Sequence, residues 1–287
     1  MEQETSPILA FTHVTKRFTH SQSGAQMLAL NDLNMVLYPG MVVGLLGQNG
    51  AGKSTLMRCA LGILSADTGD IRVLGESPAQ LSSKVKERIG YVPQQPFGYE
   101  GFTVEKALDL HRSFYPQWDA ELEHTWLMRF ELDSKQQVQR LSVGQRQSLA
   151  LIMAMAYRPA LLMLDEPVAS LDPIARRKFM ADLFDLALDS GSAVLFSSHI
   201  TQDLERVASH VALIKRGELV FFKEIDALRE QVRLIRLAAD TDLPSDVRVL
   251  NRHGDKVLVD LNEGQALPAV VSNEALNLEQ LFMELHA

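Results

Sequence analysis

Short, continuously apolar runs alternate with helical stripes along most of this chain. The runs Met41–Leu46 and Leu161–Leu164 are almost wholly apolar, as is the centre of Ser192–Ser197. Short runs without alternation are typical of parallel strands that are buried on both faces. After the first run, apolar residues recur at the spacing of one helix face, at Leu56, Cys59, Ala60 and Ile63. The pattern therefore predicts an α/β fold around a buried parallel sheet.

Two further regions predict subdomains attached to this sheet. Ile8–Phe18 and Leu28–Leu37 alternate loosely on either side of the polar residues 19–26, and Ile71–Leu74 is another strand-like run. These runs predict an antiparallel β subdomain. Residues 103–132 have a helical pattern rich in aromatic residues, among them Trp118 and Trp126. They predict a helical subdomain inserted at about residues 95–158.

The character of the chain changes near Lys223, just after a predicted hairpin formed by Val211–Lys215 and Glu218–Phe222. A short helical run is followed by alternating segments, and Asn277 and Gln280 cap a last amphipathic helix. We expect residues 1–224 to form one domain and residues 225–287 a small α+β accessory module. The expected elements of the module are a helix at Ala227–Gln231, strands at Val232–Ala238, Val247–Asn251 and Val257–Leu261, and a helix at Asn277–Leu285.

The segment Gly47–Ser54 reads Gly-Gln-Asn-Gly-Ala-Gly-Lys-Ser and fits the phosphate-loop pattern. It lies between a predicted strand and a predicted helix, which is the context that this motif requires. Glycines let backbone N–H groups turn inward, and the helix N-terminus adds a partial positive charge. Lys53 then reaches the β- and γ-phosphates, and the Ser54 hydroxyl is a ligand for Mg²⁺. The motif predicts that the protein binds a nucleoside triphosphate.

Polar residues follow three of the predicted strands, at the sheet edge where the phosphate loop also lies. They indicate which side chains act on the bound nucleotide. Asp165 and Glu166 end the run Leu161–Leu164, Gln94 follows a strand at 89–92, and His199 follows Ser192–Ser197. Ligands bind at the carboxyl edge of open α/β sheets. There Asp165 is placed to hold Mg²⁺, Glu166 to accept a proton from an attacking water, and His199 to hydrogen-bond the γ-phosphate.

Other candidate positions have a structural reading as well as a functional one. Ser142 and Gln145 form a capping box, so the following helix offers a second anion site or is simply well capped. Asp172 before a proline is fully explained as a helix cap. Phe18 either packs in the core or stacks on a purine base. The rings of Phe97, Tyr99 and Phe102 line a docking groove or belong to the helical subdomain.

Composition narrows the class of protein. The chain has a formal net charge of −8, which disfavours a nucleic acid partner. Its single cysteine, Cys59, excludes an internal disulfide and suits a reducing compartment. No basic leader opens the sequence, and the longest apolar stretch is broken by Arg158-Pro159. We expect a cytoplasmic protein that docks on a membrane partner.

In their order along the chain, these residues resemble the ATP-binding-cassette (ABC) ATPases, the nucleotide-hydrolysing subunits of ABC transporters. The resemblance covers residues 8–222 and implies the P-loop NTPase ABC-ATPase fold. It matches Gly47–Ser54 to the Walker A loop, Leu161–Asp165 to Walker B, Leu141–Gln145 to the family signature and Ala169–Asp172 to the D-loop. The implied catalytic residues are Glu166, His199 and Gln94, and the implied Mg²⁺ ligands are Ser54, Gln94 and Asp165. The implied ATP-binding residues are Phe18, Gly47, Gln48, Asn49, Gly50, Ala51, Gly52, Lys53, Ser54, Thr55, Ser142, Gly144, Gln145 and Asp172.

The resemblance also implies partners. In this family two ATPase chains form a head-to-tail dimer, with each ATP between one Walker A loop and the partner's signature helix. Here that implies a second ATPase subunit, either another copy of this chain in a homodimer or a sister ATPase, with ATP and Mg²⁺ bound between the two. The chain has Val143 where the signature usually has glycine, which puts close backbone approach to the phosphate in doubt. A separate membrane permease would dock near Phe97–Phe102 and hold the ATPase on the cytoplasmic face of the cell membrane. The tail is similar to those of ATPases paired with ABC-2-type permeases, which mostly export.

Three other functions fit parts of the sequence. An ABC ATPase that acts on ribosomes or nucleic acid would carry two cassettes or a long coiled coil, and this chain shows neither. A nucleotide-gated regulatory subunit would not need the base Glu166. A P-loop small-molecule kinase would leave Leu141–Gln145 unexplained.

Overall fold

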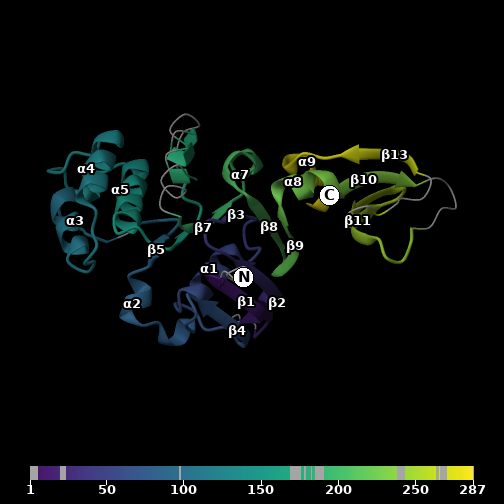
Figure 1. Ribbon diagram of the computed structural model, residues 1–287, viewed down its shortest axis with the longest axis horizontal. Helices are drawn as coiled ribbons and strands as arrows, with labels where there is room; N and C mark the ends of the chain where they lie inside the picture. Colours follow the sequence, from purple (N-terminus) through teal and green to yellow (C-terminus); the bar gives the residue numbers. More distant parts are fainter. Residues whose placement is uncertain are drawn as a thin grey trace, which may run out of the picture.

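A six-stranded sheet lies at the centre of the molecule (Figure 1). Its order is β5-β6-β7-β3-β8-β9; the first five strands are parallel, and β9 pairs antiparallel with β8. The strands are β3 Val42–Leu46, β5 Ile89–Val92, β6 Leu161–Leu164, β7 Ala193–Ser198, β8 His210–Lys215 and β9 Glu218–Glu224. The computed structural model describes residues 6–19, 24–96, 98–168, 176–177, 179–181, 183–184, 191–237, 243–262, 265 and 270–286.

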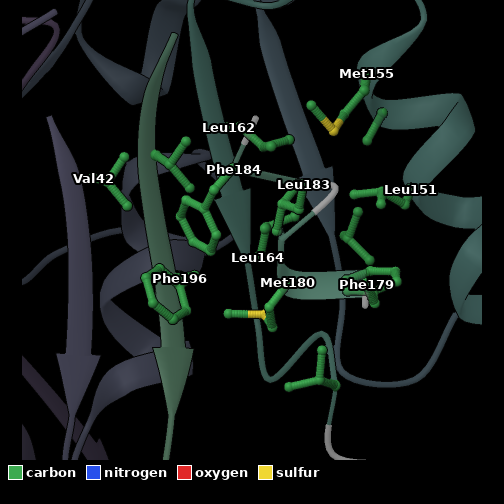
Figure 2. Packing of buried hydrophobic residues seen from close by; sticks show 14 of the residues in the cluster. Val42, Leu151, Met155, Leu162, Leu164, Phe179, Met180, Leu183, Phe184 and Phe196 are labelled. Carbon is green, nitrogen blue, oxygen red and sulfur yellow. The ribbon is translucent and has the colours of Figure 1, made fainter. Parts of the chain in front are cut away.

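Successive residues of the central strands enter different cores. In β3, Val42 joins one apolar cluster, whereas Val43 joins a second cluster on the opposite face of the sheet. This is the two-residue period of a strand. Figure 2 shows part of the first cluster, in which the rings of Phe184 and Phe196 meet edge-on with their centroids 5.3 Å apart. Because both faces are covered, these strands are apolar throughout, as the sequence pattern predicted.

A three-stranded antiparallel sheet covers the second cluster. Its order is β2-β1-β4, and together with helix α1 it packs against the face of the sheet that carries Val43. The bounds are β1 Leu9–Thr19, β2 Gln26–Leu37, β4 Thr68–Val73 and α1 Lys53–Ala60. The antiparallel β subdomain predicted from the sequence is therefore confirmed.

Helix α1 ends earlier than its apolar stripe predicts. Ile63 lies beyond the helix and its side chain is 60% exposed, so its predicted place in the buried stripe was wrong. The chain turns at Gly62, which has φ +70°, and a Cβ atom there would lie 2.2 Å from the carbonyl oxygen of Pro78. This close approach stops the helix and turns Ile63 toward solvent.

The helical subdomain projects from one side of the sheet (Figure 1). It consists of α3 Val104–Arg112, α4 Ala120–Arg129 and α5 Val143–Met155. Thr103 and Asp119 cap the first two helices, and Ser142 and Gln145 form the predicted capping box at the start of α5. Shorter elements among the described residues before 224 include α2 Ser83–Lys86, α7 Thr201–Val207 and the 3-10 turns Pro78–Gln80 and Val138–Arg140.

The accessory module is a four-stranded antiparallel sheet flanked by two helices. Its order is β11-β12-β10-β13, and Asn277 and Gln280 cap the last helix as predicted. Strand β13 was not predicted, because Ser, Asn and Glu interrupt its apolar alternation. The bounds are α8 Ile225–Gln231, β10 Val232–Leu237, β11 Arg248–His253, β12 Lys256–Asp260, β13 Val270–Ala275 and α9 Leu278–His286.

The module shares a core with the rest of the chain. Leu278, Leu281 and Leu285 of α9 are buried in the same apolar cluster as Leu204 of α7. The boundary at residue 224 stays a prediction. Among the described residues, no helix has the length and apolar character needed to cross a lipid bilayer.

Candidate functional site

The phosphate loop turns tightly between β3 and α1. Gly50 and Gly52 have φ values of +81° and +115°, a backbone region that favours glycine. A Cβ atom on Gly52 would lie 2.3 Å from the carbonyl oxygen of Ala29, and one on Gly47 would lie 2.5 Å from that of Ile214. The loop is therefore pressed between β2 and β8, and both positions require glycine.

Lys53 opens helix α1, and its ammonium group folds back over the loop. It donates to the carbonyl oxygens of Gly47 at 2.7 Å and Gln48 at 3.1 Å. Burial lowers the pKa of Lys53, and the carboxylates of Glu166 and Asp165 act in the opposite direction. The loop thus holds a desolvated cation beside inward-facing backbone, as anion binding requires.

Two acidic residues follow β6 next to this lysine. Asp165 is buried, and one of its oxygens accepts a hydrogen bond from the Ser197 hydroxyl at 2.9 Å. The backbone N–H of Glu166 donates to the same hydroxyl at 2.8 Å. Glu166 has φ +47°, an uncommon value for a residue other than glycine. Such strain is concentrated at functional sites, where the surroundings hold it in place.

The carboxylate of Glu166 is the point on which the other polar residues converge. Its Oε1 lies 3.7 Å from Nζ of Lys53. Its Oε2 accepts from Nε2 of Gln94 at 3.3 Å and lies 3.5 Å from Nδ1 of His199. These residues come from four separate segments that each follow a strand of the central sheet, Lys53 after the intervening phosphate loop. Their convergence puts a cation, a carboxylate and two hydrogen-bonding side chains at one sheet edge.

The remaining predicted site residues lie in other places. Phe18 is partly exposed near the end of β1, with the ammonium of Lys16 5.6 Å from its ring centroid. Ser142, Gly144 and Gln145 lie at the start of α5, well apart from α1 in Figure 1. Thr55 lies in the first turn of α1. Asp172 and the rest of the predicted D-loop fall outside the described residues, as does Phe97.

Comparison with known proteins shows which family this chain belongs to. A family model described as "ABC transporter" matches residues 30–169. The ABC transporter ATP-binding protein YtrB of Bacillus subtilis is 32% identical over 223 residues, which cover 77% of this chain and 76% of YtrB. This chain belongs to the ABC transporter ATP-binding proteins. Methionine import ATP-binding protein MetN of Protochlamydia amoebophila is 30% identical over 92% of this chain and 82% of MetN.

Solved structures agree on the fold of this ABC ATP-binding protein. An ATP-binding subunit of an ABC transporter aligns with a TM-score of 0.67 and 26% identity over 78% of this chain and 92% of that chain. The dimeric cassette MJ0796 bound to ADP and Pi aligns with a TM-score of 0.67 and 22% identity over 75% and 98% of the two chains. The predicted ABC-ATPase fold is confirmed, and the protein is the ATP-binding subunit of an ABC transporter.

The donor set at the sheet edge contains a carboxylate, a hydroxyl and an amide, which offer the oxygen ligands that Mg²⁺ prefers. Mg²⁺ is usually bound by one or two carboxylates, with water and substrate phosphates completing its shell. One oxygen of Asp165 is fixed by the Ser197 hydroxyl, which limits the rotation of the carboxylate. Asp165, Ser54 and Gln94 are thus suited to the metal that accompanies ATP.

Ser197 is a site residue that sequence reasoning missed. Its hydroxyl, fully buried in β7, contacts both acidic residues that follow the neighbouring strand β6. Nothing in the sequence marks it, because serine in an apolar run is ordinary and the pairing of β6 with β7 is not local. Only the adjacency of the two strands gives this hydroxyl its role.

We expect Ser197→Ala to lower kcat for ATP hydrolysis about ten-fold or more while changing KM for ATP less, because misplaced catalytic groups slow the reaction. The free energy of unfolding should fall by about 1–3 kcal/mol, since two buried polar groups lose a partner. Steady-state kinetics and chemical denaturation measure the two effects.

Ser192→Ala is the matched control for Ser197→Ala. Ser192 is also buried, at the opposite end of β7, where its hydroxyl donates to the carbonyl oxygen of Pro159. Its loss should cost stability and leave kcat unchanged. An equal fall in kcat for both variants would contradict a positioning role for Ser197.

Proposed function

We propose that this ABC ATP-binding protein hydrolyses ATP with Glu166 as the base and that hydrolysis drives a separate membrane permease. The observation that carries the proposal is the convergence of Lys53, Gln94 and His199 on the Glu166 carboxylate. A nucleotide-binding subunit without turnover has no use for a carboxylate held there by strained backbone.

Each residue has a distinct task in this mechanism. Lys53 and the loop N–H groups hold the phosphates and offset the negative charge that grows in the transition state. Glu166 accepts the proton of the attacking water, and Gln94 and His199 orient that water and the γ-phosphate. Asp165 and Ser54 would hold Mg²⁺, which neutralises charge on the phosphate oxygens when bound.

A second copy of the chain completes the proposed site. The start of α5 presents Ser142 and Gly144 on the helical subdomain, in a different part of the chain from the loop of Lys53. Helix N-termini bind anions, so one chain carries two phosphate-binding surfaces that it cannot bring to one nucleotide. Val143 is 49% exposed at this helix start and would face the partner. We propose a homodimer in which each signature helix closes over the partner's ATP.

The permease is proposed to dock beside the segment that follows Gln94. Tyr99 and Phe102 pack against the core of the helical subdomain with ring centroids 6.3 Å apart, and the Tyr99 hydroxyl contacts Nδ1 of His111 at 3.1 Å. Docking would place the protein on the cytoplasmic face of the membrane. Export is the proposed direction, from the similarity of the tail to ATPases of ABC-2-type permeases. Among the relatives, BcrA of Bacillus licheniformis is a bacitracin transport ATP-binding protein, with 28% identity over 87% of this chain and 80% of BcrA.

Tyr99→Ala tests the docking proposal. We expect it to lower permease-stimulated ATP hydrolysis by about ten-fold while basal hydrolysis stays near the wild-type rate, because a buried aromatic anchor carries much of an interface. The measurement is phosphate release by the purified ATPase with and without membranes that contain the co-expressed permease. Equal loss of the stimulated and basal rates would contradict the proposed docking site.

The proposed direction of transport has its own test. Transport assayed in sealed membrane vesicles shows whether the substrate is exported or imported.

A further inference from the structure

The terminal helix α9 is held by the rest of the chain at both of its ends. At its start, a carboxylate oxygen of Glu205 on α7 accepts a hydrogen bond from the backbone N–H of Leu278 at 2.7 Å. At its end, the ammonium of Lys215 donates to the carbonyl oxygen of Leu285. A negative charge at the N-terminus and a positive charge at the C-terminus of a helix both match its dipole. The helix is therefore clamped by two complementary charges.

The anchor at the end of α9 adjoins the phosphate loop. Lys215 ends β8 and precedes the two-residue turn Arg216-Gly217, whose residues have φ values of +51° and +83°. Positive φ at both positions is typical of the tight turns that join hairpin strands. The N–H of Gly217 donates to the carbonyl oxygen of Ala51 at 2.9 Å. One turn thus joins the end of α9 to the loop that holds the phosphates.

A small cavity lies between the tail and the loop. Its volume is about 240 Å³, and it is lined by residues 48–51 of the phosphate loop together with Lys215, Arg216 and His286. Nδ1 of His286 is 2.8 Å from the carbonyl oxygen of Phe282, which fixes the ring in the last turn of α9. The outer side of the loop therefore faces the accessory module.

Glu205, which contacts the start of α9, lies close in sequence to His199 of the candidate site. Glu205 lies on α7, which begins at Thr201, shortly after His199. Helices α7 and α9 pack together, and Leu204 and Leu278 share one apolar cluster. Helix α9 of the accessory module thus contacts Lys215, next to the turn that bonds the phosphate loop, and α7, the helix that follows His199. The phosphate loop and His199 are far apart in the sequence.

We propose that α9 couples the accessory module to nucleotide occupancy: Lys215, as a positioning residue, joins the helix to the phosphate loop, and Glu205 joins it to the helix that follows His199. ATP binding orders the phosphate loop and the segment around His199, and through Lys215 and Glu205 it holds α9 more firmly in place. By linkage, an event that loosens α9 weakens ATP binding by the same factor. The inference rests on the proposed nucleotide site and adds a regulatory role for the module.

Lys215→Met tests the coupling, because it keeps most of the side chain's length and removes its charge. We expect the Kd for a non-hydrolysable ATP analogue with Mg²⁺ to rise about five-fold or more, which is the usual size of coupling between sites. Lys215→Arg should retain wild-type affinity. In the wild-type protein, the amides of α9 should exchange hydrogen more slowly when the analogue is bound, and this protection should be lost in Lys215→Met. Calorimetric titration and hydrogen exchange with mass spectrometry provide the readouts.

Arg248→Met is the matched control. Arg248 also joins the module to the rest of the chain by a cationic donor, with NH2 2.6 Å from the carbonyl oxygen of Val220, and its ion-pair partner Asp260 lies at the end of β12 rather than on α9. It should lower thermal stability without changing the Kd. The coupling would be overturned if Lys215→Met kept the wild-type Kd for the analogue and the wild-type protection of the α9 amides. An equal rise of the Kd in Arg248→Met would overturn it as well. A wild-type chain that does not bind the analogue would overturn the nucleotide site itself and the coupling with it.

Discussion

Glu166→Gln should lower the rate of ATP hydrolysis by about 10²–10⁴-fold, the usual contribution of a positioned general base. The amide has nearly the same shape as the carboxylate and still accepts a hydrogen bond, so the contact with Gln94 at 3.3 Å is preserved in geometry. It cannot take a proton from water, however. Phosphate release under saturating ATP measures the loss, and calorimetric titration should show that ATP still binds.

Glu121→Gln is the control for Glu166→Gln, because Glu121 is exposed on α4 and the substitution changes charge by the same amount. It should hydrolyse ATP at the wild-type rate. With ATP and Mg²⁺, Glu166→Gln should also shift from monomer to dimer in solution mass measurements, since the closed state no longer decays. Undiminished turnover would assign the base to another group. A variant that binds ATP and stays monomeric would replace the homodimer with a different second subunit.

Gly52→Ala should abolish tight ATP binding and destabilise the protein even without nucleotide. The new Cβ atom would meet the carbonyl oxygen of Ala29 at 2.3 Å, and this backbone atom has little room to yield because it belongs to strand β2. The φ of +115° adds about 1–3 kcal/mol of conformational strain for a residue with a side chain. Chemical denaturation of the nucleotide-free protein measures the loss of stability, and titration with ATP measures binding.

Gly50→Ala separates backbone strain from steric overlap. Gly50 also has a positive φ, +81°, but no atom lies within 4 Å of the Cβ position. We expect its free energy of unfolding to fall by only about 1–2 kcal/mol, the cost of a left-handed residue. If Gly52→Ala is no less stable than Gly50→Ala, the loop is not pressed against β2 as the geometry requires.

The parts of the site that follow strands were predictable because their signals are local. The glycine spacing that ends in Lys53 and the acids after β6 each combine a short apolar run with the residues that chemistry needs at a sheet edge. The sequence likewise indicated the antiparallel subdomain, the inserted helices and the capped start of α5.

What the sequence did not reveal depends on contacts between distant segments. Ser197 bonds residues that follow the strand next to its own, and Lys215 donates to Leu285, 70 residues further along the chain. Ile63 fits the period of α1, but the close approach of Gly62 to Pro78 ends the helix before that position is reached. Strand β13 has weak alternation and is specified by its pairing with β10.

The division of the central sheet between two cores has a consequence for motion. The phosphate loop and α1 rest on the cluster that carries Val43, together with the antiparallel subdomain. The helical subdomain rests on the opposite cluster, which carries Val42. In the proposed dimer, a rotation of α3–α5 toward the partner chain would therefore repack only one face of the sheet. The packing beneath the phosphate loop would stay unchanged while the signature helix moves toward the partner's nucleotide.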